Sequence, residues 1–145
     1  MKRALVTGGS GAIGAAICRR LATDGCHVYV HANSNLRQAE SLVSEIVADG
    51  GSAVAVTFDV TQAEETASAL QRMLADGPIQ IVVNNAGIHD DAVMPGMNAE
   101  QWFRVIDTSL NGFFNVTQPL LMPMMGTRWG RIINLSSIAA LTGNR

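Results

Sequence analysis

The chain has 145 residues, of which 48% are hydrophobic and 15% charged, and its formal net charge is −2. These values predict one globular domain, residues 1–145, with a sizeable core, and they exclude a disordered chain and a basic surface for nucleic acid. The sequence shows no signal peptide and no long apolar run, so we expect a cytoplasmic protein that binds neither membrane nor nucleic acid.

A glycine-rich turn follows the first predicted strand and leads directly into a helix. Residues 7–14 read TGGSGAIG. Glycines let backbone amides approach a polyphosphate, and a helix N-terminus adds a positive dipole at the same point, so the turn predicts a dinucleotide-binding site. Two patterns fit: G-x-G-x-x-G ending at Gly14, or T-G-x-x-x-G-x-G beginning at Thr7 with Ala12 in place of its middle glycine. In the second pattern Ala12 is expected to be the first helical residue, with a negative φ.

The rest of the chain alternates apolar strands with amphipathic helices at even spacing. This alternation predicts an α/β protein with a Rossmann-like, doubly wound parallel sheet between two helix layers, in which ligands lie at the carboxyl ends of the strands. The expected strands cover residues 27–31, 53–58, 79–83 and 130–137, and the expected helices cover residues 15–22, 36–48, 64–74 and 99–125.

The long helix expected from Ala99 carries three further signals. Asn98 and Gln101 resemble a capping box at its start. Pro119 is expected to kink it. Its apolar residues exceed one stripe, so they either belong entirely to the core or partly face a second protein chain.

Four short motifs stand at the ends of successive predicted strands. They are the glycine turn at residues 7–14, the pair Asp59-Val60, the run NNAG at residues 84–87 and the run GRIINLSS at residues 130–137. In this order they resemble the short-chain dehydrogenase/reductase family, and residues 7–14, 105–115 and 126–137 are most similar to 3-oxoacyl-[acyl-carrier-protein] reductases. The resemblance covers the N-terminal part of that family, and it implies later strands and helices that this chain lacks.

The resemblance implies a nicotinamide dinucleotide held at these strand ends. Asp59 would accept a hydrogen bond from the adenine amino group, although a turn residue that caps local amides has the same appearance in the sequence. Asn84 would tie the strands of the sheet together. The other implied contacts are Gly8, Ser10, Ile13 and Gly14 at the pyrophosphate and ribose, the Val60 amide at the adenine ring, and Asn85, Ala86 and Gly87 at the ribose.

The residues after the second strand favour NADP(H) over NAD(H). An NAD enzyme usually presents an acid to the ribose 2′-OH at this point. Residues 31–34 read HANS, and Asn33 and Ser34 can donate hydrogen bonds to a 2′-phosphate without repelling it. Arg37 follows one helical turn later, either near that phosphate or on a solvated helix face. Gly11 stands where many NADP-dependent relatives carry an arginine.

The catalytic groups of the family are a serine, a tyrosine and a lysine, supported by an asparagine. Ser137 matches the serine, with Ser136 as the alternative, and would hydrogen-bond the substrate carbonyl. Ser109 stands at the position of the asparagine, where its shorter side chain would have to hold a water for the proton relay. Asn111, two residues later, faces another side of an α-helix and does not inherit the role.

The tyrosine and lysine of the family are expected beyond Arg145. Tyr29 and Lys2, the single tyrosine and lysine of the chain, lie on the second strand and at the N-terminus, so neither can substitute. We therefore expect either the N-terminal part of a longer enzyme or a non-catalytic nucleotide-binding fragment.

The function that the resemblance implies is an NADPH-dependent ketoreductase that reduces 3-oxoacyl thioesters on acyl carrier protein. A short-chain dehydrogenase of another secondary alcohol or ketone is the alternative within enzymes. Arg128 matches a basic residue that such reductases present to the acidic carrier, although an ordinary solvated arginine would look the same. The resemblance also implies a homo-oligomer, a tetramer. Residues 89–91 read HDD and are expected to form a polar loop rather than a metal site, because no second ligand cluster accompanies them.

Overall fold

The computed structural model describes residues 1–143 and contains one five-stranded sheet. The strand order is β3-β2-β1-β4-β5, and all four neighbouring pairs are parallel. This arrangement confirms the predicted Rossmann-like fold. The strands are β1 (Arg3–Val6), β2 (His27–Ala32), β3 (Ser52–Thr57), β4 (Ile81–Asn84) and β5 (Arg131–Asn134).

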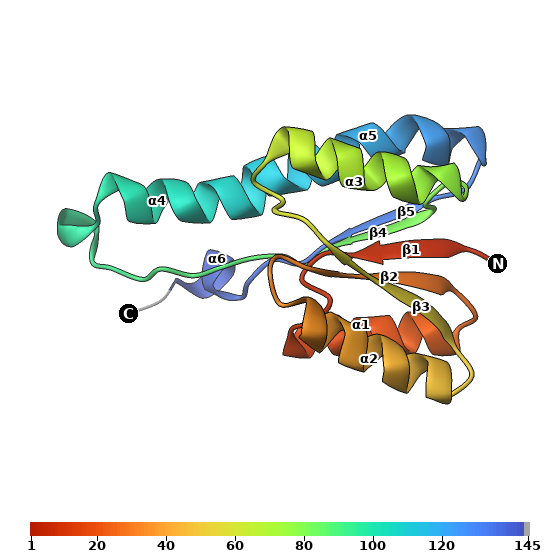
Figure 1. The fold of residues 1–145 in the computed structure, drawn as a ribbon. Coiled ribbons are helices and arrows are strands. Elements are labelled where there is room, and N and C mark those ends of the chain that lie inside the picture. The colour runs from red at the N-terminus through yellow and green to blue at the C-terminus, as the bar shows by residue number, and fades with distance from the viewer. Residues whose placement is uncertain (144–145) are drawn as a thin grey trace.

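Helices cover both faces of the sheet (Figure 1). Helices α1 and α2 lie below it in that view, and α3 and α5 lie above it, which gives three layers. The helices are α1 (Ala12–Thr23), α2 (Leu36–Ala48), α3 (Ala63–Ala75), α4 (Ala99–Ile106), α5 (Gly112–Gly126) and the short α6 (Ala139–Thr142), with a 3-10 turn, η1, at Met94–Gly96. No helix within residues 1–143 has the length and apolar content needed to cross a bilayer.

Alternate residues of the central strands supply two separate apolar cores. Ala4 and Val6 of β1 pack on the side of α1 and α2, whereas Leu5 packs on the side of α3 and α5. Strand β5 is much less covered, since Ile132 and Ile133 are 39% and 47% exposed. The closed part of the core therefore lies around β1, β2 and β4.

The order of the strands creates a crevice at the carboxyl edge of the sheet. From β1 the chain crosses through α1 to β2, and it later returns through α3 to β4 on the other side of β1. The connections thus leave β1 and β4 in opposite directions, which is where ligands bind in open α/β sheets. The glycine turn follows β1 at this point.

The predicted long helix is interrupted by a π-helical segment, η2, at Asp107–Asn111, which separates α4 from α5. The capping box of Asn98 and Gln101 at its start is confirmed. Helix α5 continues through Pro119 to Gly126, and the kink expected at Pro119 stays a prediction. The irregular winding lies next to the carboxyl edge of the sheet, where α4 extends beyond the strands (Figure 1).

Candidate functional site

Three glycines of the turn, Gly8, Gly9 and Gly14, are required by its conformation or its packing. Gly8 has φ +62°, in the left-handed region that residues with a Cβ rarely adopt. A Cβ on Gly14 would lie 2.3 Å from the Gly8 carbonyl oxygen and 2.7 Å from the Cα of Gly9, so α1 can approach the turn this closely only with glycine there. A Cβ on Gly11 would meet only the Gly8 oxygen, at 3.4 Å. A Cβ on Gly9 would lie 2.9 Å from the Val6 carbonyl oxygen, so each of the two patterns contains a tight glycine besides Gly14. The left-handed φ of Gly8 and the room for a Cβ at Gly11 are what favour the T-G pattern.

Helix α1 begins at Ala12, as the T-G pattern predicts. Arg128 is the one non-glycine residue with a positive φ in the chain up to residue 143, so Ala12 has the negative φ that was expected. Alanine therefore costs no left-handed strain at this position.

The start of α1 presents unpaired backbone donors. Gly11, the N-cap, has no side chain to bond them, and Ala15 is the first helical residue whose amide finds a partner, the Gly11 carbonyl oxygen at 2.7 Å. In the described part of the chain the amides of Ala12, Ile13 and Gly14 have no partner. Three free amides at the positive end of a helix fit a polyphosphate.

The segment after β4 is locked to the glycine turn. The Thr7 hydroxyl accepts hydrogen bonds from the amides of Asn85 (3.0 Å) and Ala86 (2.9 Å) and donates to the Val83 carbonyl (3.3 Å). The Asn85 side-chain amide donates to the carbonyl oxygens of Thr7 (2.9 Å) and Gly8 (3.0 Å). The Asn85 side chain thus holds the turn in place, a role that the sequence did not suggest, and its contact with a ribose stays a prediction.

A buried histidine also holds the turn, and sequence reasoning missed it. His31, on β2, is 2% exposed. The Gly8 amide donates to its Nδ1 at 3.0 Å, and its Nε2 lies 2.8 Å from the Phe58 carbonyl oxygen. The amide of Gly8 is therefore engaged inside the protein, and the free amides of α1 are the donors left for a phosphate. The position of His31 on a buried strand, two residues before Asn33, was the sequence signal that could have pointed to this role.

Asp59 follows β3 at the carboxyl edge of the sheet and lines neither of the two cavities described below. Its Oδ1 accepts from the amide and the hydroxyl of Thr61, at 2.9 and 2.8 Å, so one carboxylate oxygen caps a local turn. The neighbouring Val60 is fixed by α5: the Asn115 side chain donates to its carbonyl at 2.9 Å, and a Cβ on Gly112 would lie 2.8 Å from its Cγ2. The contact of Asp59 with adenine remains a prediction.

A cavity of about 390 Å³ brings most of the predicted cofactor residues together. Asn33 lies at its rim, whereas Ser34 and Arg37 are exposed and do not line it. The residues that line it are Gly8, Ser10, Gly11, Ala12, Ile13, Gly14, Ala32, Asn33, Asn85, Ala86 and Gly87.

A larger cavity of about 780 Å³ contains both predicted catalytic serines. Ser109 comes from η2, and Ser137 follows β5, where its hydroxyl accepts from the Ala139 amide at 3.2 Å. Asn111 does not line the cavity, and its side chain donates to Asp107 at 2.7 Å. The residues that line both cavities are Ile13, Asn85, Ala86 and Gly87, so the two cavities adjoin.

Asn84 connects three elements beneath this second cavity. Its side-chain amide donates to the Thr117 hydroxyl on α5 at 3.0 Å and to the Asn134 side chain on β5 at 2.9 Å. Asn84 thus ties β4 to β5, as the resemblance implied.

Arg128 lies at the opposite edge of the sheet. It precedes β5, whereas Ser137 follows that strand. The adjacent Trp129 ring lies between two cations, with Lys2 Nζ 4.2 Å and Arg131 Cζ 4.8 Å from its centroid. Tyr29 is buried in the core. The structure therefore brings neither the predicted carrier contact nor the single lysine and tyrosine to the serines.

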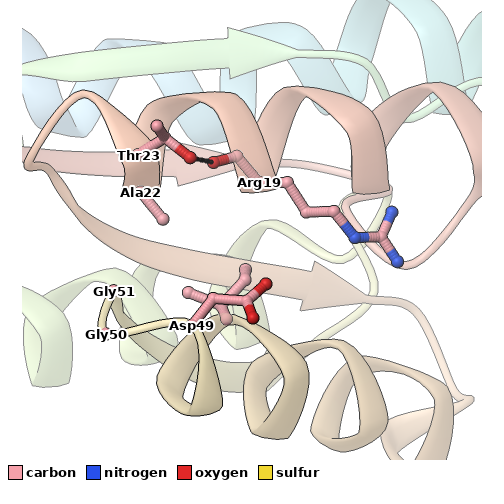
Figure 2. A pocket seen from close by; sticks show the side chains of 7 residues that line it. Arg19, Ala22, Thr23, Asp49, Gly50 and Gly51 are labelled. Carbon is pink, nitrogen blue, oxygen red and sulfur yellow. Dashed lines mark hydrogen bonds between the residues drawn. The ribbon is translucent and has the colours of Figure 1, made fainter.

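A small cavity of about 200 Å³ lies between the ends of α1 and α2 (Figure 2). Two of its polar side chains are bonded to neighbouring groups of the protein: the Thr23 hydroxyl donates to the Arg19 carbonyl at 2.9 Å (Figure 2), and the Arg19 guanidinium pairs with Glu45 at 2.6 Å. None of the predicted site residues lines it. We assign it no ligand.

The polar loop after Gly87 is attached to α4. The Gln101 side chain donates to Asp90 at 3.0 Å, and Arg104 forms an ion pair with the same carboxylate. The hydrogen bond from Gln101 and the positive charge of Arg104 lower the pKa of Asp90. Asp90 thus serves as an anchor for the loop.

The fold and the crevice define a dinucleotide-binding α/β protein, and comparison with known proteins specifies the family. The family model described as short chain dehydrogenase matches residues 2–145. The chain belongs to the short-chain dehydrogenase/reductase family, whose members use NAD or NADP.

Three relatives show how far the similarity extends. Nodulation protein G of Azospirillum brasilense is 41% identical over 143 residues, which cover 98% of this chain and 58% of the relative. The 3-oxoacyl-[acyl-carrier-protein] reductase FabG of Staphylococcus aureus is 39% identical over 144 residues, which cover 99% of this chain and 58% of the relative. The enzyme of that name from Aggregatibacter actinomycetemcomitans is 40% identical over 143 residues, which cover 97% of this chain and 59% of the relative. The chain thus spans somewhat more than half the length of these relatives.

Proposed function

We propose that the chain is the nucleotide-binding part of an NADPH-dependent ketoreductase that reduces 3-oxoacyl thioesters on acyl carrier protein. The observation that carries this proposal is the cavity that Ser109 and Ser137 share with Asn85, Ala86 and Gly87, next to the glycine turn. Relatives named 3-oxoacyl-[acyl-carrier-protein] reductase, at 39–40% identity, support the choice of substrate.

The residues of the crevice fit such a cofactor. The free amides of Ala12, Ile13 and Gly14 would bind the pyrophosphate, with Gly14 allowing close approach. Asp59 and the Val60 amide would hold the adenine, and Ala86 and Gly87 would line the ribose next to the larger cavity. When bound, NADPH supplies the hydride.

The two serines would act on the substrate from two different segments that line the larger cavity. Ser137, which follows β5, would donate a hydrogen bond to the substrate carbonyl oxygen and fix its position. Ser109, on η2, would hold a water for proton transfer. The tyrosine that donates the proton in this family and the lysine that assists it are part of the proposal and would have to be supplied by the complete gene product.

The rim of the smaller cavity supports NADP(H) rather than NAD(H). Asn33 lines it, and residues 31–34 contain no acid that would repel a 2′-phosphate. N33D is expected to weaken NADP⁺ binding about tenfold relative to NAD⁺, because it adds a like charge beside that phosphate. N35D is the matched control, since it adds the same charge at the N-cap of α2, outside the cavity lining. Equal effects of the two substitutions on the ratio of affinities would contradict the proposal.

Arg128 remains a proposed contact with acyl carrier protein. The proposed assembly is a tetramer, and the proposed compartment is the cytoplasm. Because Arg128 lies at the edge opposite Ser137, replacing it should raise the KM for carrier-linked substrate without changing the turnover of a free thioester.

The exposed apolar side chains of Phe103 and Phe114, 58% and 60% exposed, support a partner chain on α4 and α5.

The deciding experiment assays the complete gene product for NADPH oxidation. Acetoacetyl thioesters of acyl carrier protein and of coenzyme A are compared with free ketones and with oxidation of free secondary alcohols. The proposal expects the highest kcat/KM with the carrier thioester. Activity confined to free alcohols would favour the other dehydrogenase class, and nucleotide binding without turnover of any of these would favour a non-catalytic protein.

A further inference from the structure

The hydrogen bonds of His31 fix the position of its proton. The Gly8 main-chain N–H can only donate, so Nδ1 must carry no proton to accept from it at 3.0 Å. The Phe58 carbonyl can only accept, so Nε2, at 2.8 Å, must carry one. Only the neutral Nε2–H tautomer satisfies both partners.

The ring links the two parts of the crevice that would hold a nucleotide. On one side it holds Gly8, whose φ of +62° opens the glycine turn. On the other it holds Phe58, directly before Asp59 and Val60. A single side chain thus connects the phosphate-binding turn to the adenine-binding turn across β2.

The surroundings of the ring favour its neutral form. Burial lowers the pKa of His31 from its ordinary 6.5, while the bond to the Phe58 carbonyl and the charge of Asp59, from the β3 side, act in the opposite direction. On the α1 side Cys18 lies beneath Gly9, and burial raises the pKa of its thiol to about 12, so it adds no charge near neutral pH. Asp59 is the charge that faces the ring within residues 1–143.

Protonation of this ring would put two donors against each other. A proton on Nδ1 would face the Gly8 N–H across 3.0 Å, which removes the acceptor of a part-buried amide and leaves a buried cation. The turn then loses the bond from Gly8 to β2, and the bonds from Asn85 and Gly11 to the Gly8 carbonyl oxygen remain.

We propose that His31 is a positioning residue that makes nucleotide binding depend on its protonation: the turn binds NADP(H) only while this ring is neutral. The inference rests on the proposed nucleotide-binding function. Because the bound form excludes the proton, affinity should fall by up to about tenfold for each pH unit below the pKa of His31 in the free protein.

The test measures NADP⁺ affinity of the complete gene product calorimetrically between pH 5 and 8, with its H31N and H31Q variants. Asparagine can offer an acceptor to the Gly8 amide in place of Nδ1, whereas glutamine can reach the Phe58 carbonyl in place of Nε2. H31N should therefore retain affinity at pH 7.5 and keep only the pH dependence that comes from the 2′-phosphate of NADP⁺, which titrates at about pH 6, and H31Q should lose roughly tenfold at pH 7.5. The urea midpoints of the two variants show whether both remain folded.

His27 provides the matched control at the other end of β2. Its pKa is also lowered, chiefly by burial, and its Nδ1 bonds the Ser52 hydroxyl at 2.7 Å, far along the strand from the turn. H27N should keep the wild-type pH profile of binding. An unchanged pH profile in H31N, or equal affinities of H31N and H31Q, would overturn the role of His31. Wild-type protein that binds no NADP⁺ at any pH would overturn the proposed function itself, and this inference with it.

Discussion

The glycine turn and the two serines lie at the same edge of the sheet, but they are built differently. The turn is held by three side chains, Thr7, Asn85 and His31, and each of them forms hydrogen bonds with main-chain atoms. Ser109 and Ser137 are exposed and stand on irregular segments, a π-helical segment and the residues after β5. The nucleotide end of the crevice is therefore fixed by the packing of this chain, whereas the reaction end is open. Substitutions should therefore lower the free energy of unfolding strongly at the glycine turn and only slightly at the two serines.

The largest effect is expected at the closest contact of the turn. G14A places a Cβ 2.3 Å from the Gly8 oxygen and should lower the free energy of unfolding by about 3 kcal/mol, because backbone atoms must move. G11A, whose Cβ would meet that oxygen at 3.4 Å, should change it by less than about 1 kcal/mol. Urea unfolding measures the free energy of unfolding of the two variants. Equal losses in G14A and G11A would contradict the close packing at Gly14.

Removal of the Thr7 hydroxyl comes next. T7V keeps the shape of the side chain but leaves the amides of Asn85 and Ala86 without their acceptor, at a cost of about 2 kcal/mol of unfolding free energy. T7S retains the hydroxyl and should recover most of that loss. If T7S is as unstable as T7V in the same urea titration, the hydrogen bonds do not hold the turn.

A smaller effect of opposite sign is expected at Arg128. Gly8 and Arg128 both have left-handed backbones, with φ of 62° and 54°, but only Arg128 carries a Cβ there. R128G should raise the free energy of unfolding by about 1 kcal/mol by removing this strain, whereas R128A keeps the strain and should gain nothing. Thermal or urea midpoints of R128G and R128A measure these changes in stability. A gain in stability in R128A as large as that in R128G would contradict backbone strain at Arg128.

The smallest effect on stability is expected at the serines. S109A should alter the free energy of unfolding by less than about 0.5 kcal/mol, because the side chain is exposed and within residues 1–143 no hydrogen bond to it is found. In the complete enzyme the same change should lower kcat by roughly tenfold, and S109N should preserve turnover. A loss of stability comparable to that of T7V would mean that this end is packed as tightly as the turn.

Local sequence patterns predicted the fold and the place of the site. Apolar alternation indicated all five strands, the capping box at Asn98 predicted the start of α4, and Thr7-Gly8 with Gly14 predicted where α1 begins. These features depend on contacts between residues near one another in the chain, which periodicity and turn chemistry report directly.

The sequence by itself determined which chain segments meet at the carboxyl edge, because parallel strands joined by helices place their ends together. Only the tertiary structure decided what each polar group does there. In the structure the Asn85 side chain bonds the turn, and His31 bonds Gly8 and Phe58. Each of these bonds depends on which donor finds which acceptor across long sequence separations, and the burial that makes an unpaired group costly arises only once the chain is folded.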